Sequence, residues 1–205
     1  MVVALDACHD RSRAVARAAL ADHDGLWYVL DVAASCAGQA RNDGIEAALA
    51  LLGDQAVDLR RVWLAGTDAD TQVPPDWLVR HLALAGRGAD LVAGFARLYD
   101  DPQLSPHARR RYDEQMAAVA RDDGTHVHVY GANLGVRASV WRAVGGFPRV
   151  TLGEDAALLA AVQRAGGCVV RPVEPTVLTG GRRRGRAPGG LADLLDALEA
   201  QRLLA

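Results

Sequence analysis

The chain of 205 residues suits one domain with a sizeable core of its own, and no apolar run approaches the roughly 20 residues that a membrane-spanning helix requires. The formal net charge of −2 gives no general attraction for nucleic acid or an anionic bilayer, so any polyanion has to be bound by a local patch. All 23 basic residues are arginines, which excludes Schiff-base chemistry and every phosphate-binding loop or hydrolase motif that depends on a lysine.

Short apolar runs alternate along the chain with longer stretches of helical period. This alternation predicts one α/β domain over residues 1–205, in which helices flank a mostly parallel central sheet. We expect strands at residues 2–5, 27–32, 61–65, 91–95, 127–130 and 168–171, and helices at residues 13–21, 43–52, 74–85, 105–121, 138–144, 154–165 and 190–204. Ser12, Asn42 and Pro74 mark three of the helix starts.

The last part of the chain departs from the regular alternation. Residues 180–190 are rich in arginine and glycine, and we expect a mobile loop there. The apolar spacing of the helix that follows fits ordinary packing, while a peripheral contact with a membrane surface or a partner helix stays open as an alternative.

The three cysteines (Cys8, Cys36 and Cys168) are far apart in the sequence. Their spacing indicates neither a disulfide framework nor a cysteine metal site. The first residues lack the pattern of a secretory signal. We therefore expect a reducing, cytoplasmic location.

Polar residues gather just after the predicted strands, which is where open α/β sheets bind their ligands. They are Asp6 and Asp10 after the first strand, Asp68 and Asp70 after the third, Gly131 and Asn133 after the fifth, and Glu154 and Asp155 at a later helix start. The sequence thus predicts a concentration of carboxylates at one edge of the sheet.

Asp68 and Asp70 form an Asp-x-Asp motif directly after an apolar strand. On extended backbone, two residues apart, their carboxylates lie on one face, roughly 6.5 Å apart along the chain. Such a pair suits Mg²⁺ or Mn²⁺, which complete their coordination with water and substrate phosphate oxygens. The plainer interpretation is a turn whose side chains cap the helix that opens at Pro75.

Glu154 and Asp155 precede a helix of amphipathic pattern. Acidic residues at that position cap a helix and suit its dipole. A carboxylate fixed there, near a diphosphate, would alternatively take the proton of an attacking hydroxyl as a general base.

The Arg-Gly segment holds four arginines in five positions, Arg182, Arg183, Arg184 and Arg186. Guanidinium groups of this kind pair with phosphate oxygens and would fold over a diphosphate, with Arg182 and Arg186 as donor-binding candidates. The alternative is a solvated basic loop. Nucleic-acid binding is not favoured, because aromatic residues are absent from the segment and the net charge is negative.

His126 and His128 alternate along the predicted strand at 127–130 and would share one of its faces. No third ligand lies nearby in the sequence, so we expect histidines of a strand surface rather than a metal site.

Four groups of residues, in this order, resemble the GT-A-fold glycosyltransferases, specifically the family 2-like inverting enzymes. They are the strand and acidic turn at 2–12, the Gly-Gln-Ala-Arg-Asn-Asp-Gly segment at 38–44, the Asp-x-Asp motif with its continuation at 74–78, and an acceptor-side block at 131–137, 145–148 and 153–155. The resemblance covers residues 2–170 and implies a Rossmann-like GT-A fold.

The resemblance implies transfer of a sugar from a nucleotide-diphospho-sugar donor to a hydroxyl acceptor, with inversion at the anomeric carbon. Asp6 would contact the nucleotide, with Asp10 and Arg41 on the same donor side, and Asp68 and Asp70 would hold the metal and the ribose-diphosphate. Asp155, beside Glu154, would be the base. Gly131 and Asn133 belong to the acceptor-side block, and residues 97–126 would form an acceptor-side insertion.

The chain departs from the family's pattern at its start. A further strand and helix usually precede the position of Val2 and carry part of the base-recognition surface, so we expect the first strand to be missing. A catalytically silent domain that binds a nucleotide or a partner is therefore an alternative hypothesis. A nucleotidyltransferase is less favoured, because no Gly-rich loop with a basic residue follows the first strand.

Overall fold

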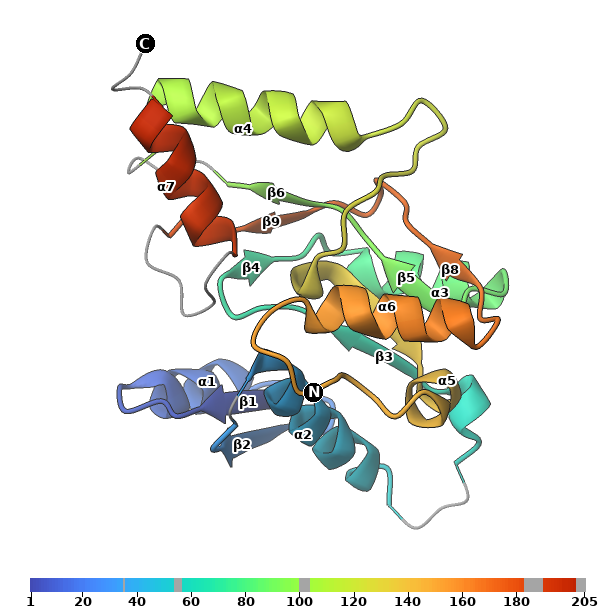
Figure 1. Cartoon of the computed structure of the whole chain (residues 1–205). Coiled ribbons are helices and arrows are strands. Elements are labelled where there is room, and N and C mark those ends of the chain that lie inside the picture. Colours follow the sequence, from blue (N-terminus) through green and yellow to red (C-terminus); the bar gives the residue numbers. More distant parts are fainter. Residues whose placement is uncertain (35, 54–56, 100–103, 183–189, 202–205) are drawn as a thin grey trace.

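The computed structural model describes residues 1–34, 36–53, 57–99, 104–182 and 190–201, and its helices and strands form an α/β fold (Figure 1). The first part is a βαβ unit. Strands β1 (Val2–Asp6) and β2 (Tyr28–Val32) pair in parallel and are joined by helix α1 (Ser12–Leu20). Helix α2 (Ala37–Ala50) packs on β1, and Leu5, Leu20 and Val29 form a small core between these elements.

The central sheet has the strand order β3-β7-β5-β8. Its members are β3 (Trp63–Gly66), β5 (Leu91–Ala93), β7 (Leu134–Arg137) and β8 (Val169–Val170), and a single 3-10 turn, η1 (Leu59–Arg61), precedes β3. Helix α6 (Glu154–Arg164) lies in front of the sheet and α3 (Trp77–Gly86) behind it (Figure 1), while α5 (Ala138–Ala143) follows β7. Leu91, Val136, Leu158 and Val162 belong to the main core.

A third sheet has the order β4-β9-β6, with β4 (Thr71–Gln72), β6 (Ala96–Leu98) and β9 (Val177–Thr179). Helices α4 (Pro106–Val119) and α7 (Leu191–Gln201) pack on one another at this end of the molecule (Figure 1). A second core, which includes Phe95, Tyr112, Leu195 and Leu198, joins these two helices to β6. Residues 106–119 of the segment 97–126 therefore form a packed helix, and the apolar residues of α7 serve that packing.

The arrangement of strands does not confirm a mostly parallel sheet. The pairs β1–β2, β5–β8 and β6–β9 are parallel, whereas β3–β7, β5–β7 and β4–β9 are antiparallel. Two of these three antiparallel pairs involve β7, which follows a one-turn 3-10 helix, η2 (Gly131–Asn133), and lies between β3 and β5.

The expected strand at residues 127–130 is wrong. His126 forms only an isolated bridge with Ala120, and its buried ring contacts the Ala93 carbonyl oxygen at 3.0 Å and packs against Phe95. Burial of that ring in the core, together with Tyr130 beside it, fixes the segment without a strand partner. His126 and His128 thus do not line a strand face.

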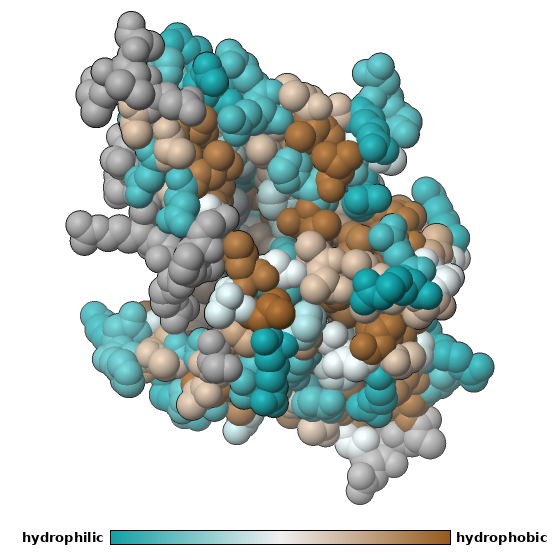
Figure 2. Space-filling view, in the orientation of Figure 1, coloured by the Kyte–Doolittle hydropathy of each residue, from teal (hydrophilic) through white to brown (hydrophobic). Residues whose placement is uncertain are grey.

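The exposed surface mixes polar and apolar residues. Figure 2 shows apolar residues gathered in the middle of one face and polar residues along its upper and lower ends. Val150 and Leu152, in the segment before α6, are exposed apolar side chains. No helix in the described ranges is long and apolar enough to cross a bilayer.

Candidate active site

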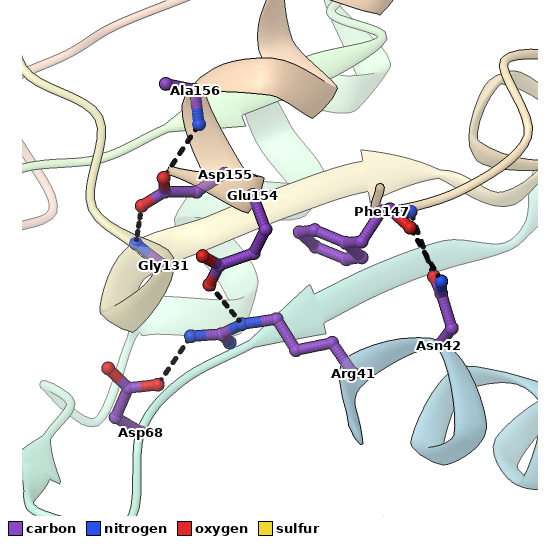
Figure 3. Close-up of polar contacts among 8 residues, drawn as sticks. All are labelled: Arg41, Asn42, Asp68, Gly131, Phe147, Glu154, Asp155 and Ala156. Carbon is purple, nitrogen blue, oxygen red and sulfur yellow. Dashed lines mark hydrogen bonds and ion pairs between the residues drawn. The ribbon is translucent and has the colours of Figure 1, made fainter. Parts of the chain in front are cut away.

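Arg41 lies at the centre of the candidate site and joins three stretches of the chain (Figure 3). It extends from α2, and its Nη2 donates to Asp68 Oδ1 over 2.7 Å. Its Nε donates to Glu154 Oε1 over 3.4 Å. Only 19% of the Arg41 side chain and 12% of the Glu154 side chain are exposed, so this pair is largely removed from water, whereas the Asp68 side chain is 42% exposed. Residues that are 27 and 113 positions away from Arg41 in sequence are thereby brought together.

Asp68 reaches Arg41 from a turn and not from extended backbone. Strand β3 ends at Gly66, and the Thr71 N–H donates to the Asp68 carbonyl oxygen over 3.1 Å, which reverses the chain into β4. The expectation that Asp68 and Asp70 share one face of a strand is therefore wrong. The partners of their carboxylates are arginines, so helix capping does not explain them either.

Helix α6 places the two acidic residues of its first turn in different directions (Figure 3). Gly153 precedes them with a φ of 77°, a left-handed conformation that favours glycine. Glu154 turns toward Arg41, whereas Asp155 accepts from the backbone N–H of Gly131 over 2.8 Å and from that of Ala156 over 2.7 Å. The carboxylate of Asp155 is thus fixed beside η2 and close to Arg41.

Gly131 allows this close approach because it has no side chain. A Cβ atom at this position would lie 2.4 Å from Nη2 of Arg41, well inside van der Waals contact. The glycine therefore lets the guanidinium lie against the backbone that holds Asp155.

The charges around Arg41 are strongly coupled. Burial pulls the pKa of Arg41 down, but the surrounding carboxylates, Asp68 first, together outweigh burial and raise the pKa above its ordinary value. Glu154 and Asp155 add to this rise. The guanidinium thus stays a fixed positive charge among three carboxylates.

Asp70 lies in the turn before β4, beside the residues that follow β9, and is paired with Arg182. Its backbone oxygen accepts from the Gly180 N–H over 3.0 Å, and its Oδ2 lies 3.1 Å from Nε of Arg182. The Asp70 side chain is 27% exposed and that of Arg182 is 65% exposed. Arg186 and most of the loop expected to be mobile lie outside the described residues.

The structure places Asn133 inside the protein. Its side chain is fully buried, and Nδ2 donates to the carbonyl oxygens of Phe95 and Pro175, each over 2.8 Å. Its Oδ1 accepts from Trp77 Nε1 over 2.8 Å and from His81 Nε2 over 3.1 Å. Asn133 is the last residue of η2, and its bonds to three neighbouring segments fix this turn in place.

Asp6 and Asp10 have local partners at the end of β1. Asp6 Oδ1 accepts from the Ala34 N–H over 3.0 Å, and Asp10 Oδ1 accepts from the Ser12 N–H over 2.9 Å. Hydrogen bonds from Ser12 hold the pKa of the exposed Asp10 below its ordinary value. In the described part of the chain, the ion pairs of Arg41 include neither residue.

The donor set fits a hard divalent cation that shares its coordination with substrate. Within the described ranges, no three His, Cys, Asp or Glu side chains converge as a complete metal cluster. Asp68 and Asp70 are the accessible carboxylates, with side chains 42% and 27% exposed. Mg²⁺ or Mn²⁺ typically takes one or two protein carboxylates and adds phosphate oxygens and water.

Asn42 has a role that differs from the helix start expected there. Helix α2 begins at Ala37, so Asn42 lies inside it. The Asn42 Nδ2 donates to the Phe147 carbonyl oxygen over 2.8 Å, and its Oδ1 accepts from the Phe147 N–H over 2.9 Å. The pair tethers α2 to the segment before α6, and Phe147 lies under the Arg41 guanidinium, 5.9 Å from ring centre to Cζ. Only a contact across 105 positions gives this signal.

Two buried histidines predict a loss of stability in acid. Burial lowers the pKa of His81 and of His126 below the ordinary value of 6.5, and the bonds of the rings to Asn133 and Ala93 offset this only in part. The unfolded chain therefore takes up protons near pH 6.5 while the folded chain does not. Stability is complete above that pH and falls below it, by up to about 1.4 kcal/mol per pH unit for each histidine.

Urea unfolding at about pH 7.5 and about pH 5 measures this loss. The replacement His81→Gln keeps a donor for Asn133 and removes the titrating ring, so its pH slope is expected to be smaller than that of the wild type. His9→Ala, at an exposed position, is the control and should keep the wild-type slope. A wild-type stability that is flat over this interval would contradict the prediction.

Comparisons with known proteins agree with one another on the fold. The profile of the family "Glycosyl transferase family 2" matches residues 1–144, and no curated protein matches the chain. Among solved structures, the mannosyltransferase PcManGT from Pyrobaculum calidifontis, in complex with GDP-Man and Mn²⁺, is similar with a TM-score of 0.62 and 18% identity, over 100% of this chain and 60% of that chain.

Two further solved structures are similar. S. aureus TarS 1–349 has a TM-score of 0.57 and 11% identity, over 89% of this chain and 51% of that chain. A mycobacterial protein has a TM-score of 0.54 and 16% identity, over 98% of this chain and 62% of that chain. The chain thus spans about half to three fifths of the length of these neighbours.

Proposed function

Because the chain belongs to glycosyl transferase family 2, we propose that it transfers a sugar from a nucleotide-diphospho-sugar donor to a hydroxyl acceptor, with inversion at the anomeric carbon. The observation that carries this proposal is the meeting of Asp68, Arg41 and the Glu154–Asp155 pair in one place. The positive charge of Arg41 suits a donor diphosphate, and a carboxylate beside it suits an acceptor hydroxyl.

In the proposed reaction, the acceptor oxygen attacks the anomeric carbon on the face opposite the diphosphate. As the new carbon–oxygen bond forms, the bond to the diphosphate oxygen breaks, and its electron pair stays on the leaving group. Asp155 takes the proton of the acceptor hydroxyl. One displacement inverts the anomeric carbon, so a single carboxylate base is enough.

The leaving diphosphate gains negative charge in the transition state, and Arg41 stabilises that charge. We propose that Asp68 and Asp70 hold Mg²⁺ or Mn²⁺, which neutralises further charge on the diphosphate when it is bound. The accessible pair of carboxylates supports this proposal, as does the similar mannosyltransferase, whose structure holds GDP-Man and Mn²⁺.

The remaining assignments are proposals of the same kind. Asp6 and Asp10, Arg182 and the unplaced Arg186 would contribute to donor binding, and residues 97–126 would face the acceptor. Gly131 is proposed for the acceptor side through the N–H that holds Asp155. A cytoplasmic location is consistent with the three free cysteines, Cys8, Cys36 and Cys168.

One observation favours a second function, that of a catalytically silent domain. In the described part of the chain, β1 and β2 form a sheet of their own that is not hydrogen-bonded to β3. A nucleotide surface divided between two separate sheets would bind donor incompletely. The chain would then bind a nucleotide or a partner without transferring sugar.

A donor screen separates the two functions. The purified chain is incubated with Mn²⁺ and a panel of nucleotide sugars that includes GDP-mannose and UDP-glucose, and release of nucleoside diphosphate is followed with and without EDTA. An active transferase should release nucleoside diphosphate from at least one donor as it transfers the sugar to water or to an added acceptor. EDTA should abolish this release. Metal-dependent binding without release would favour the silent domain.

A further inference from the structure

Both aspartates proposed to hold the metal are already paired with an arginine. Asp68 is bonded to Arg41, and Asp70 lies 3.1 Å from Arg182. The two pairs differ in burial, because the Arg41 side chain is 19% exposed and that of Arg182 is 65% exposed. Exposed ion pairs contribute little, so Arg182 is easily displaced from Asp70. The Arg41–Asp68 pair is therefore the one that opposes binding of a cation.

Three contacts hold the Arg41 guanidinium where it is. Its Nε lies against the buried Glu154, its Cζ lies over the ring of Phe147, and its Nη2 lies against the backbone of Gly131. An arginine side chain also cannot lose its proton to make way for another cation. A divalent ion that approaches Asp68 alone therefore meets a fixed positive charge.

A diphosphate changes this balance. Guanidinium groups form paired hydrogen bonds with phosphate oxygens, so a diphosphate offers Arg41 a new partner in place of Asp68. The carboxylate that is released becomes available to the cation. Each ligand thus removes the obstacle that the other meets, and the coupling between them is reciprocal.

Resting on the proposed function, we propose that Arg41 is a competing counterion at Asp68 that makes the divalent cation and the nucleoside diphosphate bind cooperatively. In the absence of diphosphate, Arg41 occupies Asp68 and keeps the affinity for the cation low. When the diphosphate binds, Arg41 exchanges Asp68 for phosphate oxygens, and the site accepts the cation. The site is thereby loaded with cation and donor together.

Binding of Mn²⁺ alone tests this proposal, because the expected change is a gain. Free Mn²⁺ is measured by electron paramagnetic resonance in titrations of the wild type and of Arg41→Gln. The variant is expected to bind Mn²⁺ at least about tenfold more tightly, since Asp68 has lost its competitor. Arg164→Gln removes the same charge at an exposed position at the end of α6 and should bind Mn²⁺ as the wild type does.

A second variant keeps the charge and displaces the side chain. In Gly131→Ala, the new methyl group collides with Nη2 of Arg41 and should move it from Asp68, which also tightens Mn²⁺ binding. Circular dichroism checks that both variants are folded. If neither variant binds Mn²⁺ more tightly than the wild type, while Asp68→Asn binds it more weakly, the counterion proposal is wrong and the metal site stands.

Titrations in the presence of GDP or UDP complete the test. In the wild type, either nucleotide should raise the Mn²⁺ affinity of the protein at least about tenfold, and in Arg41→Gln this enhancement should shrink. If Asp68→Asn and Asp70→Asn leave Mn²⁺ binding unchanged with and without nucleotide, the metal site of the proposed function fails, and the counterion proposal fails with it.

Discussion

Replacing Asp155 with asparagine is expected to lower kcat for sugar transfer by about 10²- to 10⁴-fold, while the donor Kd stays near the wild-type value. The amide cannot take the hydroxyl proton, but its oxygen can still accept one of the N–H bonds from Gly131 and Ala156 that place the carboxylate. The protein should therefore fold with an intact donor site and a slow chemical step. Release of nucleoside diphosphate from the donor found in the screen measures kcat.

Two other variants make this result specific. Asp22→Asn, in an exposed turn after α1, is the matched control and should keep full activity. Glu154→Gln should alter donor and metal binding more than kcat, because Glu154 is bonded to Arg41, the proposed partner of the donor diphosphate. A kcat of Asp155→Asn within a factor of about three of the wild type would rule out Asp155 as the base.

Replacing Asn133 with alanine is expected to lower the free energy of unfolding by about 3 kcal/mol or more. The substitution leaves the Trp77 and His81 donors and the carbonyl oxygens of Phe95 and Pro175 buried without their partner. Each unsatisfied buried group costs about 1–3 kcal/mol, although water entering the vacated space recovers part of this.

Urea unfolding at neutral pH measures the difference. Gln163→Ala, at an exposed position of α6, is the control and should change stability by less than about 0.5 kcal/mol. A loss of less than about 1 kcal/mol in Asn133→Ala would show that the four bonds do not fix η2 as described.

The parts of the fold that local signals determine were predictable from the sequence. The helix expected at 105–121 is α4, which spans Pro106–Val119, and its start follows from Ser105, whose side chain accepts from the Ala108 N–H over 3.2 Å. The strand expected at residues 2–5 and the helix expected at 13–21 are likewise present, as β1 and α1. In these segments the apolar period and the cap agree, so no distant contact is needed to decide the structure.

Other parts depend on contacts that no local pattern encodes. The sequence predicts no strand at residues 134–137, where the short strand β7 lies, because its pairing with β3 and β5 comes from residues far away in the chain. The buried ring of His126 replaces the strand that alternation predicted.

The residues that meet at Arg41 carry local signals in the sequence, but their arrangement does not. An acidic pair after a strand indicates Asp68, an acidic helix start indicates Glu154 and Asp155, and the family resemblance adds Arg41. That Arg41 bridges Asp68 and Glu154 depends on the way α2 and α6 are held together through Asn42 and Phe147. The role of Asn133 likewise depends on distant contacts. Its amide is buried, and nothing in the sequence around it indicates this.

The position of Mn²⁺ in crystals grown with Mn²⁺ and GDP or UDP tests the central claim most directly. Anomalous diffraction at the manganese edge locates the ion independently of any assumption about the site. We predict an anomalous peak bonded to a carboxylate oxygen of Asp68 or Asp70, with the diphosphate between that ion and Arg41. A nucleotide and Mn²⁺ bound together elsewhere on the protein, with Asp68 still paired to Arg41, would contradict the account.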